Sequence, residues 1–250
     1  MSKIALITGA TAGIGKATAE LFAKNGINLI LCGRRKERLD ELRQTLGESV
    51  KVTTLSFDVR NREAVFSAID SLPEHWKSID ILVNNAGNAH GLDTVQNANI
   101  DDWDAMIDGN VKGLLYVTRA VLPGMIAKND GHIVNIGSIA GEQVYSKGAV
   151  YCASKFAVDA LSQGMRLDLL DHNIRVTNIA PGLVETEFSL VRFKGDANKA
   201  DQVYKGLDAL TGADIAEAIF WSISRPAHVQ IADMLILPSA QAAATTVRRK

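Results

Sequence analysis

The chain has 250 residues, of which 47% are hydrophobic and 22% are charged, and its formal net charge is −1. This length and composition are enough for one sizeable hydrophobic core and lie within the range of a single α/β domain. A net charge near zero provides no overall positive field, so nucleic acid and acidic membrane surfaces are excluded as expected partners.

Short apolar runs alternate with longer amphipathic stretches. We expect strands at residues 4–7, 27–32, 51–57, 79–83, 132–136, 174–180 and 234–237. Several runs are continuously apolar, which is typical of strands covered on both faces. The stretches after the first two strands space apolar residues at three and four and end at Gly26 and Gly47, as helices do. The pattern predicts a single-domain, Rossmann-type α/β fold, a doubly wound parallel sheet with helices on both faces.

The first predicted strand runs into a glycine-rich turn, Thr8-Gly9-Ala10-Thr11-Ala12-Gly13-Ile14-Gly15, and a helix follows. Backbone N–H groups and a helix N-terminus in this setting can hold a pyrophosphate. The glycine spacing differs from G-x-G-x-x-G, and glycine alone also makes plain tight turns. The position after the first strand favours a dinucleotide site.

The second predicted strand ends in Cys32-Gly33-Arg34-Arg35, without a carboxylate. An acidic side chain here would accept a hydrogen bond from the ribose of NAD, whereas an arginine can bind the 2′-phosphate of NADP. The alternative is that both arginines belong to the solvated face of the next helix. We favour phosphate binding for Arg34 and leave Arg35 open.

The third and fourth strands are also followed by polar residues. Asp58 could accept a hydrogen bond from an adenine amino group or cap the helix expected near Arg60. The run Asn84-Asn85-Ala86-Gly87 could pack against a cofactor, bind neighbouring strands together, or form an ordinary turn.

Ser138 follows the fifth strand, and Tyr151-Cys152-Ala153-Ser154-Lys155 lies in the next helix. Tyr151 and Lys155 are four residues apart and share one helix face. We expect the lysine ammonium to lower the pKa of the phenol, so that Tyr151 serves as the acid/base. The Ser138 hydroxyl would bind the substrate oxygen.

Residues 182–211 have mixed charge and no clear periodicity, and we expect a substrate loop or lid. In an extended loop, Arg192 and Lys194 would point the same way and could bind the carboxylate of a small hydroxy acid. The alternative is a mobile loop with ordinary surface charges. We expect the basic tail TTVRRK to be a solvated end.

These motifs resemble those of the short-chain dehydrogenase/reductase family. TGATAGIG is similar to the family's cofactor loop, NNAG to its fourth-strand motif and YCASK to its YxxxK motif. Asn110 in DGNVKG, Ser138 in NIGSIAG, and Pro181-Gly182 followed by Thr186 agree in order and spacing. The resemblance covers nearly the whole chain.

The resemblance implies a catalytic tetrad of Asn110, Ser138, Tyr151 and Lys155, with Asn110 helping to hold a water in the proton relay. It also implies that Thr186 contacts the nicotinamide carboxamide. The implied NADP(H)-binding residues are Thr8, Gly9, Thr11, Gly13, Ile14, Gly15, Arg34, Arg35, Asp58, Val59, Asn85, Ala86, Gly87, Tyr151, Lys155, Pro181, Gly182, Val184 and Thr186. Substrate would contact Ser138, Tyr151, Arg192 and Lys194, and no metal ligand is implied.

The similarity is greatest to the branch of NADP-dependent 3-hydroxy acid, or serine, dehydrogenases, through CGRRKERL, FDVRNR and PGLVETEFSLVRFKGD. This branch implies oxidation of small 3-hydroxy acids such as serine or 3-hydroxypropanoate. One departure is Ala12, where many NADP-using relatives carry a basic residue. Phosphate selection would then rest on Arg34 and Arg35.

Three rival functions are compatible with parts of the same pattern. They are a broad-specificity aldehyde/ketone reductase, a reductase of carrier-bound acyl chains and a non-catalytic NADP(H)-binding regulator. The resemblance implies a homo-oligomer, usually a tetramer, acting on a small molecule. The first apolar run is too short for a signal peptide or a membrane span, and Cys32 and Cys152 are too few for a disulfide framework. We therefore expect a cytoplasmic protein.

Overall fold

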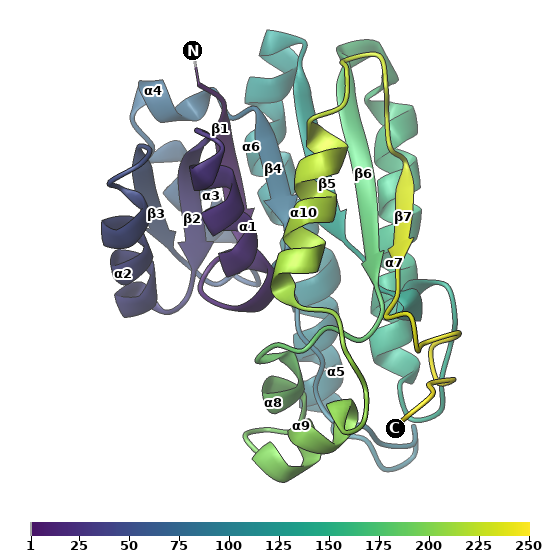
Figure 1. The fold of residues 1–250 in the computed structure, drawn as a ribbon. Helices are drawn as coiled ribbons and strands as arrows, with labels where there is room; N and C mark the ends of the chain where they lie inside the picture. The colour runs from purple at the N-terminus through teal and green to yellow at the C-terminus, as the bar shows by residue number, and fades with distance from the viewer. Residues whose placement is uncertain (1) are drawn as a thin grey trace.

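The computed structural model describes residues 2–250, and its framework is one parallel sheet (Figure 1). The strands are β1 (Ile4–Thr8), β2 (Asn28–Gly33), β3 (Val52–Ser56), β4 (Ile81–Asn84), β5 (Gly131–Ile136), β6 (Ile174–Pro181) and β7 (Asp233–Ile236). Their order is β3-β2-β1-β4-β5-β6-β7, and all neighbours pair in parallel. The predicted doubly wound sheet is confirmed, and the order reverses between β1 and β4.

Helices cover both faces of the sheet. They are α1 (Gly13–Lys24), α2 (Lys36–Leu46), α3 (Arg62–Asp70), α4 (Glu74–Lys77), α5 (Ile100–Ile107), α6 (Leu114–Lys128), α7 (Ala149–Asp168), α8 (Phe188–Arg192), α9 (Ala197–Tyr204) and α10 (Gly212–Ile223), with a π-helix η1 (Asp108–Gly113) and 3-10 turns η2 (Ile139–Gly141) and η3 (Leu170–His172). Phe22, Leu39 and Ile219 join α1, α2 and α10 in one buried cluster. Val65 and Val121 join α3 and α6 in another. Two apolar layers therefore hold the sheet between them.

The strands are buried because helices shield both of their faces, as the continuous apolar runs predicted. All five residues of β1 and all six of β5 are buried. The first two predicted helices also end where expected, since α1 stops at Lys24 before Gly26 and α2 stops at Leu46 before Gly47. Within residues 2–250, no helix has both the length and the apolar character that crossing a membrane requires.

The segment predicted as an irregular lid, residues 182–211, contains the two short helices α8 and α9. Helices of five and eight residues are too short to produce a clear apolar period, which explains why the sequence indicated a loop. Asp196 caps α9 by accepting a hydrogen bond from the Lys199 backbone N–H. Both helices lie beyond the carboxyl edge of the sheet (Figure 1).

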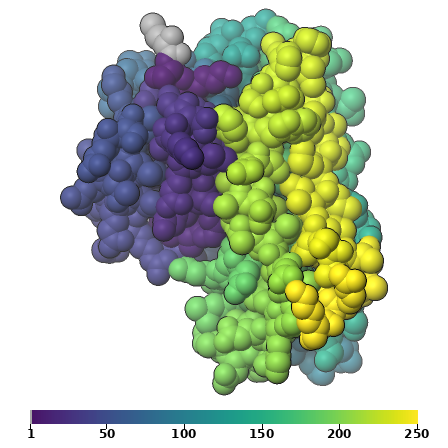
Figure 2. All heavy atoms as spheres, in the orientation of Figure 1, coloured from purple at the N-terminus to yellow at the C-terminus, as the bar shows by residue number. Residues whose placement is uncertain are grey.

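The C-terminal tail is largely exposed, as expected, and its last two residues also bind this segment. Arg249 donates hydrogen bonds to the carbonyl oxygens of Lys205 at 2.6 Å and Val203 at 3.0 Å. The Lys250 ammonium pairs with Asp208 at 2.8 Å. Figure 2 shows the C-terminal residues, in yellow, packed on the surface beside the green segment.

Candidate active site

A cleft of about 690 Å³ opens at the carboxyl edge of the sheet, lined by the loops that follow β1 to β6. Most residues predicted to bind a cofactor line it, namely Gly9, Thr11, Gly13, Ile14, Arg34, Arg35, Asp58, Val59, Asn85, Ala86, Gly87, Tyr151, Lys155, Pro181, Gly182, Val184 and Thr186. Doubly wound sheets bind ligands at this edge, near the point where the strand order reverses. The fold therefore brings the separate motifs together in one cavity.

Thr8 and Gly15 lie behind the wall of the cleft and shape the glycine-rich turn. The Thr8 hydroxyl accepts hydrogen bonds from the backbone N–H groups of Asn85 and Ala86. A Cβ atom on Gly15 would collide with the carbonyl oxygen of Gly9. Asn85 donates its amide to the carbonyl oxygens of Thr8 and Gly9 at 2.9 and 3.2 Å, so the fourth-strand motif fixes the first turn.

The two arginines after β2 have different surroundings. Arg35 donates two hydrogen bonds to the Thr11 hydroxyl, and its Nη1 pairs with Glu187 at 2.8 Å. Arg34 has a side chain that is 63% exposed, with Nη1 at 3.8 Å from Asp58. Arg34 thus keeps a guanidinium that a ligand can reach, whereas the donors of Arg35 are already engaged.

Asp58 does not cap the following helix, because Asn61 does so by accepting a hydrogen bond from the Ala64 backbone N–H. Its carboxylate instead accepts from the Arg60 guanidinium at 2.7 and 3.0 Å. Burial opposes ionisation of Asp58, but the hydrogen bonds from Arg60 and the charge of Arg34 outweigh it and lower the pKa. Asp58 therefore holds two cations at the rim of the cleft.

Three of the four predicted catalytic residues line the cleft. Tyr151 and Lys155 come from one face of α7, and Ser138 caps η2 by accepting from the Ala140 backbone N–H at 3.1 Å. Lys155 donates from its Nζ to the carbonyl oxygen of Ile136 at 2.7 Å. The end of β5 thus positions both the serine and the lysine beside the tyrosine.

Asn110, the fourth predicted residue, lies in the π-helix η1 and is buried. Its Oδ1 accepts from the backbone N–H of Asn88, and its Nδ2 donates to the Asn88 carbonyl oxygen, both at 2.8 Å. The same amide nitrogen donates to the Ser154 hydroxyl at 3.0 Å. Isolated π turns often occur at functional sites, and this one ties the loop after β4 to α7.

Burial dominates the electrostatics of Tyr151. Burial raises the pKa of Tyr151 to about 12, and the charge of Arg192 and the Ser138 hydroxyl are the influences that lower it. Burial also lowers the pKa of Lys155 to about 8. Lys155 turns toward Ile136 and is not among the groups that shift the pKa of Tyr151 here, so the effect of its ammonium on the phenol stays a prediction.

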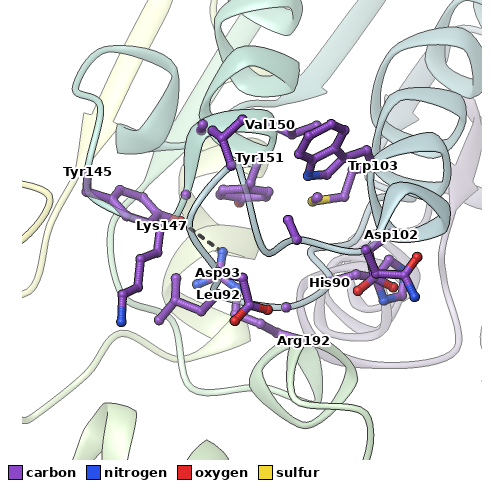
Figure 3. Close-up of a pocket in the computed structure, with 17 residues that line it drawn as sticks. His90, Leu92, Asp93, Asp102, Trp103, Tyr145, Lys147, Val150, Tyr151 and Arg192 are labelled. Carbon is purple, nitrogen blue, oxygen red and sulfur yellow. Dashed lines mark hydrogen bonds between the residues drawn. The ribbon is translucent and has the colours of Figure 1, made fainter.

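Arg192 and Lys194 do not face the same way, because they lie at the end of α8 and not in an extended loop. Arg192 points into the site, where its Nη2 donates to the Tyr145 hydroxyl at 3.0 Å (Figure 3). Lys194 has a left-handed backbone, with φ of 54°, and pairs with Asp102 at 2.9 Å. The premise that placed both cations on one anion is wrong.

The residues of the cleft wall that sequence reasoning missed include Tyr145, Arg60, Glu187 and Phe188. Glu187 forms ion pairs with both Arg35 and Arg38, so it connects the segment before α8 to α2. Its position beside Thr186 was the available signal. Tyr145 stands in a loop without periodicity, and only the fold reveals that it meets Arg192. Among residues 2–250, no three His, Cys, Asp or Glu side chains gather as metal ligands would.

Comparison with known proteins places this geometry in a family. The model of the short chain dehydrogenase family matches residues 3–196. An NADP-dependent 3-hydroxy acid dehydrogenase of Salmonella typhi is 52% identical over 239 residues, which cover 95% of this chain and 96% of that protein. Sulfoacetaldehyde reductase 2 of Chromohalobacter salexigens is 47% identical over 243 residues, covering 97% and 96%.

A solved structure shares the whole fold. The closed form of a serine dehydrogenase complexed with NADP⁺ is 49% identical and superposes with a TM-score of 0.93, over 99% of this chain and all of the other. The family match covers both the glycine-rich turn and the Tyr151–Lys155 helix. This chain therefore belongs to the short-chain dehydrogenase family.

Proposed function

We propose that this chain is an NADP(H)-dependent oxidoreductase that interconverts a hydroxyl and a carbonyl group on small 3-hydroxy acids. The observation that carries the proposal is the meeting of Tyr151, Ser138 and Lys155 with Arg192 in the wall of one cleft. Relatives named NADP-dependent 3-hydroxy acid dehydrogenase and serine dehydrogenase support the cofactor and the substrate class.

The residues of the cleft fit NADP(H). The turn after β1 and the N-terminus of α1 at Gly13 offer backbone N–H groups for the pyrophosphate. Arg34 would pair with the 2′-phosphate, and Asp58 and Val59 would lie against the adenine. Thr186 would hold the carboxamide. When bound, NADP(H) supplies or accepts the hydride.

The protein groups manage the proton. In oxidation, the substrate hydroxyl gives its proton to the Tyr151 phenolate. The carbon that bears this hydroxyl loses a hydride in the same step, so that a C=O bond forms. In reduction, the phenol returns that proton to the carbonyl oxygen, to which Ser138 donates a hydrogen bond. Lys155 restores the protonation of Tyr151 through water. Asn110 supports this relay by fixing the Asn88 backbone.

Arg192 would bind the substrate carboxylate. Within residues 2–250, its buried Nε has no hydrogen-bond acceptor. A buried donor without a partner costs roughly 1 to 3 kcal/mol, which a bound anion would recover. The two rivals that rely on other chemistry are less favoured: Lys194 pairs with Asp102 and does not offer a docking charge for an acyl carrier, and a regulator would have no need of Tyr151.

A second candidate is the reduction of a small aldehyde that carries a sulfonate. A guanidinium binds sulfonate oxygens as it binds carboxylate oxygens, and the 47% identical relative is named sulfoacetaldehyde reductase. A third is general aldehyde or ketone reduction, which the apolar side chains of Leu92 and Phe188 in the same cleft favour.

A substrate panel tests these functions. NADP⁺ reduction is followed with serine, the threonine stereoisomers and 3-hydroxypropanoate, and NADPH oxidation with keto acids, sulfoacetaldehyde, neutral aldehydes and acyl thioesters. We expect the highest kcat/KM with a free 3-hydroxy acid. A preference for neutral aldehydes or sulfoacetaldehyde would select the corresponding alternative, and no turnover with any member would refute the oxidoreductase.

We predict that Arg34→Ala narrows the preference for NADPH over NADH. The variant loses a charge-assisted hydrogen bond to a phosphate that NADH lacks, worth roughly 1.5 to 3 kcal/mol, or about one to two orders of magnitude in affinity. Dissociation constants for both cofactors measure it. Arg62→Ala is the control, because Arg62 pairs with Glu63 and does not line the cleft. An unchanged ratio in Arg34→Ala would remove this residue from phosphate recognition.

We predict that Arg192→Ala raises KM for acidic substrates far more than for neutral aldehydes. Only the acidic substrates lose an ion pair with this residue, and we expect their KM to rise by about one order of magnitude or more. Steady-state kinetics with 3-hydroxypropanoate and propanal give the comparison. Equal effects on both substrates would mean that Arg192 positions α8 without binding the carboxylate.

We also propose that the protein acts as a homotetramer in the cytoplasm. Leu115 on α6 and Phe156 and Leu167 on α7 are exposed apolar side chains, which supports an interface on these helices. Cys32 and Cys152 are free and buried, which is consistent with a reducing compartment. Light scattering of the purified protein measures the assembly.

A further inference from the structure

Arg192 contacts the general acid/base as well as the proposed carboxylate position. Its Cζ lies 4.8 Å from the centroid of the Tyr151 ring and 5.1 Å from that of Phe188. The hydrogen bond to the Tyr145 hydroxyl holds the guanidinium in this place (Figure 3). The Arg192 guanidinium therefore stacks against the Tyr151 ring from the side of α8, whereas Lys155 approaches the same ring from α7.

The charge of Arg192 is not neutralised by the protein. Arg192 takes part in none of the ion pairs formed among residues 2–250. Tyr151 is buried and Arg192 is partly buried, so water screens the interaction between them less than it would at the surface. No ion-pair partner among the described residues therefore offsets the field of this guanidinium at Tyr151.

The other groups that face Tyr151 do not replace this field. From the neighbouring loops come Ser138 and Tyr145, which are uncharged, and Cys152 is its uncharged neighbour on α7. Lys155 is 6.0 Å from the ring centroid and is hydrogen-bonded to a backbone carbonyl. Burial raises the pKa of Tyr151, and Arg192 is the largest influence that lowers it.

We propose that Arg192 has a second role, in which its cation favours the ionised form of Tyr151 and a substrate carboxylate bound to Arg192 cancels that effect. The inference rests on the proposed role of Tyr151 as the base. It couples the charge of the substrate to the proton-transfer step: a neutral alcohol meets a more readily ionised phenol than a hydroxy acid does. The two substrate classes are then oxidised with different pH dependences.

The pH dependence of oxidation tests the coupling. The wild-type kcat is measured against pH with 1,3-propanediol and with 3-hydroxypropanoate, which differ in one carboxylate. Because the phenolate is the base, kcat rises with pH. We expect this rise to occur at lower pH with 1,3-propanediol than with 3-hydroxypropanoate. In Arg192→Gln, the rise for the diol should move upward by about one to three pH units, while Arg192→Lys should preserve most of the wild-type profile.

A control variant shows whether the charge of Arg192, and not the position of its segment, sets the pH profile of kcat. Lys194→Gln removes a cation from the same segment that pairs with Asp102 and lies outside the cleft, and it should leave the profile unchanged.

The possible results also separate this inference from the function on which it rests. A wild-type protein without alcohol oxidation would refute the proposed function. If kcat for the diol rose at the same pH in the wild type and in Arg192→Gln, the coupling alone would be refuted. A shift of equal size in Lys194→Gln would assign the effect to the position of the segment and overturn the role of the Arg192 charge.

Discussion

Tyr151→Phe is expected to lower kcat by about two to four orders of magnitude, the range attributed to general acid–base catalysis. The substitution removes the hydroxyl that carries the proton and keeps the ring. The ring contacts with Phe188, at 5.7 Å between centroids, and with Arg192 should therefore persist. NADPH affinity and thermal stability should stay close to the wild-type values.

Single-turnover kinetics and fluorescence titration of NADPH measure the two halves of this prediction. Tyr116→Phe is a matched control, because it deletes a phenol hydroxyl from α6 at a position outside the cleft. The control should retain wild-type turnover. If Tyr151→Phe kept more than about a tenth of the activity, another group would have to donate the proton, and the mechanism would be wrong.

The sequence predicted the strands well because burial on both faces leaves a direct trace in the residues. Each expected strand lies within two residues of an observed one. The helices α8 and α9 left no such trace, since five and eight residues present too few turns for a periodic pattern. The contacts of the exposed tail left no trace either, because Arg249 binds backbone carbonyl oxygens, which carry no side-chain signature.

The candidate site was predictable where its residues share one element and unpredictable where two elements meet. Tyr151 and Lys155 are neighbours on α7 by helical spacing alone. The contact between Arg192 and Tyr151 depends on how α8 packs, and Lys194, whose backbone is left-handed, pairs with Asp102. Spacing also says nothing about burial, which raises the pKa of Tyr151 and lowers that of Lys155.

Lys155→Met is expected to lower kcat by about two orders of magnitude or more without destabilising the fold. Methionine keeps the length of the side chain and removes the ammonium that the proton relay requires. It also removes the cost of burying a cation, although the Ile136 carbonyl oxygen loses its donor. Since these effects oppose each other, the variant should be as stable as the wild type at pH 7, or up to roughly 2 kcal/mol more stable.

The pH dependence of stability distinguishes a functional lysine from a structural one. The unfolded chain binds the Lys155 proton up to about its ordinary pKa of 10.5, whereas burial lowers the pKa in the folded protein to about 8. Between these values the unfolded state holds more protons, so this group makes the wild-type free energy of unfolding rise with pH. Below about pH 8 the wild type bears the full cost of the buried ammonium. The stability of Lys155→Met relative to the wild type, measured by urea unfolding, should therefore be greatest below pH 8 and fall as the pH approaches 10.5. A variant that is less stable at pH 7 and gains on the wild type as the pH rises would show that the ammonium stabilises the fold, and its loss of activity would then have a structural cause.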